Sequence, residues 1–146
     1  GQEVLDSVLL GYRIAEDVRV RLPLLVNLDG FYLSFTREPV TVPQPAEVAA
    51  FLPPFDARGI AFRASAPTSQ ASAVLGGVPY SYFRYETHLA AQNAVAVYDE
   101  AAADFAARFG RSLPAVDAWG VDDAEVVLVM TGSFATKARE AVERMR

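Results

Sequence analysis

Two short apolar runs, each ending in a glycine turn, are the features that most constrain the fold of this chain. The first covers residues 22–28 and ends at Asp29-Gly30-Phe31, and the second covers residues 126–130 and ends at Thr131-Gly132-Ser133. A short apolar run bounded by turn residues is typical of a buried parallel strand. A strand, a glycine turn and a helix in succession open a Rossmann-like unit. We therefore expect an α/β fold with parallel strands.

Helical periodicity predicts the other main elements. An amphipathic helix is expected over residues 3–17, a brief helix over 46–51, a long helix over 82–108 that Gly110 ends, and a last helix after Ser133. Residues 32–38 indicate an irregular segment or one helical turn, and 40–42 and 116–119 indicate short strands. The small residues of 63–77 favour a surface connection.

Spacing along the first and the long helix predicts which faces pack. In the first helix we place Val4, Leu5, Val8, Leu9 and Tyr12 on the packed face and Asp6 on the solvent side. In the long helix the predicted seam consists of His88, Ala91, Val95, Tyr98, Ala102, Phe105 and Phe109. His88 is the single histidine, and its place on this seam favours a partly buried packing residue over a ligand or a base.

Aromatic residues gather at the head of the long helix. Tyr80, Tyr82, Phe83 and Tyr85 are interpreted as a core or interface cluster, with stacking on a ligand as the alternative.

Composition excludes several classes of function. With 52% hydrophobic and 21% charged residues the chain is an ordinary globular protein, and its net charge of −5 with no basic cluster argues against a nucleic-acid partner. The absence of cysteine excludes a disulfide, a thiolate nucleophile and a cysteine-ligated metal cluster. No apolar run is long enough for a membrane span and no signal segment is visible, so we expect a cytoplasmic protein.

Both ends of the chain lie inside helical patterns. The first pattern begins almost at residue 1, and the last runs to Arg146 without a Gly or Asn stop. We therefore expect the chain to belong to a longer polypeptide.

The two turns are the candidate sites. Asp29-Gly30 either places a carboxylate in a crevice at the end of a strand or accepts ordinary turn hydrogen bonds. Thr131-Gly132-Ser133 either holds an anion at the start of a helix or contains Ser133 as a plain helix cap, and one glycine is too few for a phosphate-binding motif. No nucleophile elbow and no set of metal ligands is present, so the chain shows no complete catalytic apparatus and we predict no metal site.

The block LPLLVNLDGFYLSFTREPV, preceded by a helix containing GYRIAE, resembles the α subunit of the pyruvate:ferredoxin oxidoreductase family of 2-oxoacid oxidoreductases. The resemblance continues through PYSYFRYETHLAAQNAV and DEAAADFAARFGR to DDAEVVLVMTGSFATKAREAVERMR. Its best matches in the first block are Asp29, Gly30, Phe31, Ser34 and Thr36. Many family members have histidine after that serine, where this chain has Phe35.

The resemblance implies a fold and a division into domains. Residues 1–62 correspond to the end of the thiamine-diphosphate-binding-fold domain that faces the cofactor's pyrimidine. Residues 63–119 correspond to a linker with the long connecting helix. Residues 120–146 correspond to the first strand and helix of a Rossmann-like, transketolase C-terminal-like domain. The implied fold is a parallel-sheet portion joined through the long helix to the start of that domain.

The resemblance also implies an activity for the complete enzyme. Such enzymes oxidatively decarboxylate a 2-oxoacid to acyl-CoA and pass electrons through [4Fe–4S] clusters to ferredoxin. Thiamine diphosphate with Mg²⁺, the clusters and coenzyme A are held by the complex or by partner subunits, and this chain alone binds none of them. The implied role of this segment is scaffold and subunit interface, with Asp29, Gly30, Phe31, Ser34 and Thr36 shaping the site, and the catalytic residues lie elsewhere.

Two other functions remain open from the residues themselves. One is a non-catalytic α/β module that binds a ligand or a partner. The other is a small-molecule enzyme that uses Thr131-Gly132-Ser133 to hold an anion.

Overall fold

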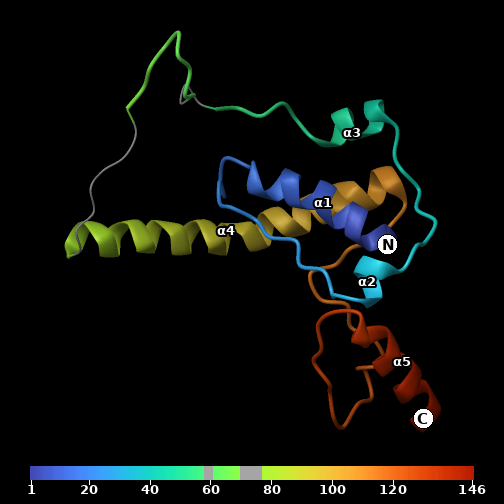
Figure 1. Ribbon diagram of the computed structural model, residues 1–146. Coiled ribbons are helices and arrows are strands. Elements are labelled where there is room, and N and C mark those ends of the chain that lie inside the picture. Colours follow the sequence, from blue (N-terminus) through green and yellow to red (C-terminus); the bar gives the residue numbers. More distant parts are fainter. Residues whose placement is uncertain (58–60, 70–76) are drawn as a thin grey trace.

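The computed structural model describes residues 1–57, 61–69 and 77–146, and the regular structure in these ranges is helical (Figure 1). The five helices within the described ranges are α1 (Gln2–Ala15), α2 (Tyr32–Phe35), α3 (Pro45–Phe51), α4 (Val78–Phe109) and α5 (Phe134–Met145). Each lies where the sequence predicts a helix or a helical turn, although α4 begins four residues earlier than predicted. Pro79 permits that early start, because proline is tolerated in the first turn of a helix.

The core lies where α1 and α3 pack against the carboxyl-terminal half of α4 (Figure 1). Phe51 and Phe105 are completely buried, and their rings meet edge to face at 5.4 Å between centroids. Phe109 lies 4.6 Å from Phe105 and 5.6 Å from Phe51, so three aromatic rings fill the space between α3 and α4. The other buried apolar residues are Leu10, Ile14, Val20, Val97 and Ala101.

The buried face of α1 differs from the predicted one. Leu10 and Ile14 are buried, whereas Val8 and Tyr12, which the spacing places on the packed face, are 38% and 57% exposed. Asp6, expected on the solvent side, is 1% exposed. The buried face of α1 includes Asp6 because this carboxylate has a partner that lies far away in the sequence.

That partner is Arg111, which follows the carboxyl end of α4. Its Nε and Nη2 atoms lie 2.6 Å from Oδ2 and 2.8 Å from Oδ1 of Asp6, a bidentate ion pair. The guanidinium also lies over the rings of Phe105 and Phe109, at 5.7 and 5.8 Å from their centroids. The side-chain amide of Gln2 donates a further hydrogen bond of 2.9 Å to Asp6. This network fixes α1 against the end of α4.

The amino-terminal half of α4 extends beyond α1 as a projecting arm (Figure 1). The predicted seam is therefore correct only in part: Tyr98, Ala102, Phe105 and Phe109 belong to the core or pack against it. His88, Ala91 and Val95 are exposed. The prediction that His88 is partly buried is wrong for the described part of the chain, since α1 does not reach that far along the seam.

The predicted parallel sheet does not appear among the described residues, where the β pairing consists of one isolated bridge between Arg63 and Ala66. Residues 22–28, 40–42, 116–119 and 126–130, all expected as strands, have no regular structure. Leu22 packs against the core, but most of the other apolar side chains lie open to solvent, as shown by Leu25 at 85% and Val129 at 92% exposure. The physical reason is that a parallel strand requires hydrogen-bonding neighbours, and the described residues place none beside these runs.

Two glycines explain where chain segments turn or approach. Gly110 ends α4 in the left-handed region at φ 68°, with its N–H donating to the Ala106 carbonyl at 2.9 Å. Gly11 lies on the buried face of α1, where an added Cβ would meet Leu24 Cδ2 at 2.8 Å. The irregular segment after α1 therefore passes directly over Gly11. From there this segment continues toward α2 and α5.

Candidate functional site

The block that follows the first apolar run forms a tight turn and then the single turn of α2. Phe31 has φ 70° and ψ −62°, and the Tyr32 N–H donates to the Gly30 carbonyl at 2.9 Å, which is the geometry of a γ-turn. A non-glycine residue in this region is strained. Ser34 stabilises this backbone conformation, because its Oγ accepts a hydrogen bond of 2.9 Å from the Phe31 N–H. The Thr36 hydroxyl donates to the Tyr32 carbonyl.

The structure brings the two predicted site blocks together. Asp29 Oδ2 accepts a hydrogen bond of 2.5 Å from the backbone N–H of Ser133, and the Ser133 hydroxyl donates to the same oxygen. The two residues are 104 positions apart in the sequence. Ser133 makes no capping hydrogen bond to α5 through its own side chain. We call this pair of hydrogen bonds the Asp29–Ser133 contact.

Hydrogen bonding at this contact stabilises the ionised carboxylate. The Ser133 hydroxyl and backbone N–H lower the pKa of Asp29, the hydroxyl contributing most, and the small loss of hydration opposes them. The positive end of the α5 dipole also favours a negative charge at this position. The carboxylate of Asp29 therefore takes the place that an external anion would occupy at the start of α5.

Aromatic rings from α2 and α5 pack beside the contact. Tyr32 and Phe134 meet edge to face at 5.7 Å, and Phe31 lies 6.0 Å from Tyr32 and 5.7 Å from Phe35. The ammonium of Lys137 lies 5.8 Å from the centre of the Tyr32 ring. Phe35 occupies the position where many family members have histidine, and its apolar ring offers no polar group there. This ring is 78% exposed and packs beside the ring of Phe31.

Other candidates lie apart from this region. The aromatic residues at the head of α4 are exposed on its projecting half, between 43% for Phe83 and 58% for Tyr82. Glu86 accepts a hydrogen bond from Tyr82 and thereby raises the pKa of that phenol. The structure places neither these side chains nor His88 in contact with α2 or α5.

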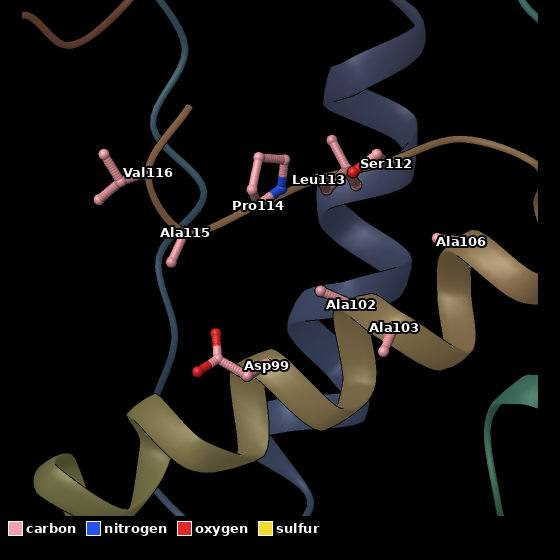
Figure 2. A pocket seen from close by; sticks show the side chains of 9 residues that line it. All are labelled: Asp99, Ala102, Ala103, Ala106, Ser112, Leu113, Pro114, Ala115 and Val116. Atoms are coloured by element: carbon pink, nitrogen blue, oxygen red, sulfur yellow. The ribbon is translucent and has the colours of Figure 1, made fainter. Parts of the chain in front are cut away.

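A cavity of about 390 Å³ lies between the outer face of α4 and the segment after it (Figure 2). Figure 2 shows Pro114 and Val116 on one side and the alanines of α4 on the other, with Asp99 at one end. The hydroxyl of Tyr98 donates to the Leu113 carbonyl at 3.1 Å and holds this segment in place. None of the predicted site residues lines the cavity, and its single carboxylate is not part of a constellation of catalytic groups.

The described part of the chain contains neither a cluster of metal-ligating side chains nor a helix fit to span a membrane. In residues 1–57, 61–69 and 77–146, no group of three or more His, Asp or Glu side chains is placed to hold a metal ion. None of the helices described combines the length and apolar character of a membrane span.

Reasoning from the sequence treats Asp29 and Ser133 as separate candidates and misses their contact. One feature of the sequence could have indicated the contact: Asp29 and Ser133 each follow an apolar run. If both runs were parallel strands, their carboxyl ends would lie at the same edge of the sheet. The buried pair of Asp6 and Arg111 was missed altogether, because nothing in local spacing connects residues 105 positions apart.

Comparisons with known proteins agree along the chain. A family model described as pyruvate flavodoxin/ferredoxin oxidoreductase, thiamine diphosphate-binding, matches residues 1–104. Pyruvate synthase subunit PorA of Methanothermobacter thermautotrophicus is 38% identical over 146 residues, which cover all of this chain and 38% of that protein. PorA of Pyrococcus abyssi is 37% identical over 145 residues, covering 99% of this chain and 36% of the relative.

A relative that is named for a different substrate matches almost as well. The α subunit of NADH-dependent phenylglyoxylate dehydrogenase of Aromatoleum evansii is 35% identical over 152 residues, covering 99% of this chain and 36% of that subunit. This chain spans less than two-fifths of the length of each of these relatives. Because the family match covers more than half of its residues, the chain belongs to the thiamine diphosphate-binding pyruvate flavodoxin/ferredoxin oxidoreductase family.

Proposed function

We propose that this chain is part of the α subunit of a 2-oxoacid:ferredoxin oxidoreductase. The complete enzyme would convert a 2-oxoacid and coenzyme A to acyl-CoA and CO₂, with the electrons passed to ferredoxin. The observation that carries the proposal is the match of residues 1–104 to the family, extended to the whole chain by the PorA relatives. Pyruvate is the first candidate substrate, because most of these relatives are pyruvate synthase subunits, and phenylglyoxylate is also a 2-oxoacid.

The match to a thiamine diphosphate-binding family supports that cofactor for the complete enzyme, and this chain spans less than two-fifths of the length of its relatives. Among the described residues, the Ser133 N–H at the start of α5 donates to the carboxylate of Asp29. We assign thiamine diphosphate binding to the assembled enzyme and to this chain a scaffold and interface role. The iron–sulfur clusters, coenzyme A and the other subunits belong to that assembly, which we place in the cytoplasm.

The finer fold is also part of the proposal. Residues 22–28 and 126–130 would pair as strands of parallel sheets once neighbouring strands are present, with residues 1–62 in the thiamine-fold domain and 120–146 in the Rossmann-like one. Their exposed apolar side chains support this, since Leu25, Leu128 and Val129 are 69–92% exposed and would be buried by such pairing.

The proposal is tested by isolating the complex that contains this chain from its source, followed by mass spectrometry of its subunits. We expect a thiamine diphosphate-binding subunit and a cysteine-rich cluster-bearing subunit at fixed stoichiometry. The chain on its own is expected to bind thiamine diphosphate weakly by calorimetry and to leave pyruvate unchanged. Turnover of pyruvate by the isolated chain would contradict the assigned role.

A further inference from the structure

We propose that Asp29 is a positioning residue that fastens the Thr131–Ser133 turn to the block from Asp29 to Thr36, so that the two form one wall of the subunit. The inference rests on the proposed function, because it names which face of the segment serves the oxidoreductase. It concerns side chains that this chain supplies itself.

Helix α5 begins without a side-chain cap of its own. Ser133 precedes α5 but does not cap it with its side chain. Its N–H and hydroxyl both donate to Asp29 Oδ2 instead. Two donors converge on one oxygen, and a charge-assisted hydrogen bond is about twice as strong as a neutral one. A carboxylate from a distant segment thus accepts from the first backbone N–H at the start of α5.

The glycine beside this serine lies in close contact with Asp29. Gly132 has φ 82°, and a Cβ added to it would lie 2.9 Å from Oδ2 and 3.1 Å from Oδ1 of Asp29. A side chain at position 132 and the carboxylate of Asp29 therefore exclude each other in the observed geometry. Gly30 differs, because an added Cβ there meets nothing within 4 Å. The close approach of Asp29 requires the glycine at 132.

Side chains of α2 and α5 pack around the contact. Tyr32 of α2 meets Phe134 of α5 edge to face, and the ammonium of Lys137 lies 5.8 Å from the centre of the Tyr32 ring. The hydrogen bonds and the rings thus join the same two helices. The consequence is that both donors of Ser133 at the start of α5 are already occupied, and the exposed rings of Phe31 and Phe35 form the open side of the wall.

A double-mutant cycle in the 146-residue chain tests the contact, with the exchange rate of the Ser133 amide as the readout. Asp29→Ala removes a charge-assisted acceptor and is expected to raise that rate roughly tenfold or more. Ser133→Ala removes the hydroxyl donor to Asp29 and is expected to raise the rate by a smaller factor. The double variant of Asp29→Ala with Ser133→Ala should exchange no faster than Asp29→Ala alone, because the contact can be lost only once. Multiplication of the two factors would overturn the proposal.

Conservative variants separate positioning from a general loss of structure. Ser133→Thr keeps the hydroxyl and should retain the slow exchange, whereas Ser133→Ala should lose part of it. Asp122→Asn removes a charge from an exposed residue of the loop before the second apolar run and should leave the Ser133 amide unchanged. Equal effects of Asp122→Asn and Asp29→Ala would overturn the assignment.

A titration with inorganic phosphate tests the closed state of the α5 start. In the unaltered chain we expect phosphate to leave the Ser133 amide resonance in place, since Asp29 already occupies its donors. A saturable shift of that resonance would contradict the proposal. Neither readout involves turnover, so a complex inactive on 2-oxoacids would refute the proposed function and leave this result intact.

Discussion

The buried ion pair of Asp6 and Arg111 yields a stability prediction that can be worked through from the structure. The Asp6 side chain is 2% exposed and the Arg111 side chain is 29% exposed. Arg111→Met leaves an ionised carboxylate with almost no access to water. Asp6→Asn leaves a guanidinium that reaches solvent and keeps its stacking on Phe105 and Phe109. The arginine variant should therefore be the less stable of the two.

The magnitude follows from the cost of an unpaired buried charge. Removing one partner of a buried pair costs about 3–5 kcal/mol. We expect Arg111→Met in the middle of this range, at about 4 kcal/mol, and Asp6→Asn below it, at about 2 kcal/mol, because the guanidinium that remains is partly hydrated. For a chain of this size, about 4 kcal/mol corresponds to a fall in Tm of roughly 10 °C or more. Replacing both residues, as Asp6→Leu with Arg111→Met, should recover a large part of the loss.

Urea unfolding followed by circular dichroism measures these differences. The matched control is Arg108→Met, which removes an arginine from an exposed pair with Asp104 on the same end of α4 and should cost less than about 0.5 kcal/mol. The reasoning is refuted when Arg111→Met and Arg108→Met reduce the free energy of unfolding equally. It is also refuted when the double variant is as unstable as the sum of the single ones.

Three further predictions concern other parts of the chain. Phe105→Ala empties a completely buried position between α3 and α4 and should cost about 3–5 kcal/mol in the same unfolding experiment, whereas Phe35→Ala, at an exposed ring, should cost less than about 1 kcal/mol; similar losses would contradict the assigned core. Gly110→Ala forces a side chain into the left-handed region that ends α4 and should cost about 1 kcal/mol, and no loss would show that the helix ends differently. Hydrogen bonds from Ser133 lower the pKa of Asp29, so their contribution to stability is complete above the ordinary aspartate pKa of about 3.9 and is lost as the pH falls through the lowered value. An NMR titration of the Asp29 carboxyl should therefore give a pKa below that of Asp29 in the urea-unfolded chain, and an equal or higher value would contradict the contact.

The helices of this chain could be predicted because their determinants are local. The apolar spacing around Phe105 and the glycine at position 110 are enough to predict α4 and its end, and Pro45 and Glu47 stand at the beginning of α3. Their packing was harder to predict. Asp6 carries the residue type of a solvent-facing position, and its burial depends on Arg111, which periodicity cannot connect to it.

The strands show the opposite relation between pattern and structure. Residues 22–28 have the composition of a buried parallel strand, but strand formation depends on neighbouring segments as well as on composition. Leu25 therefore lies exposed in this structure, although its sequence context is that of a core residue. The two candidate turns were identified from local glycines, and only the fold shows that Asp29 and Ser133 meet.

The most direct test of the central claim is the rate of 2-oxoacid-dependent electron transfer by the purified complex that contains this chain. With pyruvate and coenzyme A present, we expect reduction of ferredoxin that stops when coenzyme A is omitted and that requires thiamine diphosphate. Phenylglyoxylate and other 2-oxoacids should be compared under the same conditions. The account would be contradicted by a complex that contains its thiamine- and cluster-bearing subunits but fails to reduce ferredoxin with any of the 2-oxoacids tested.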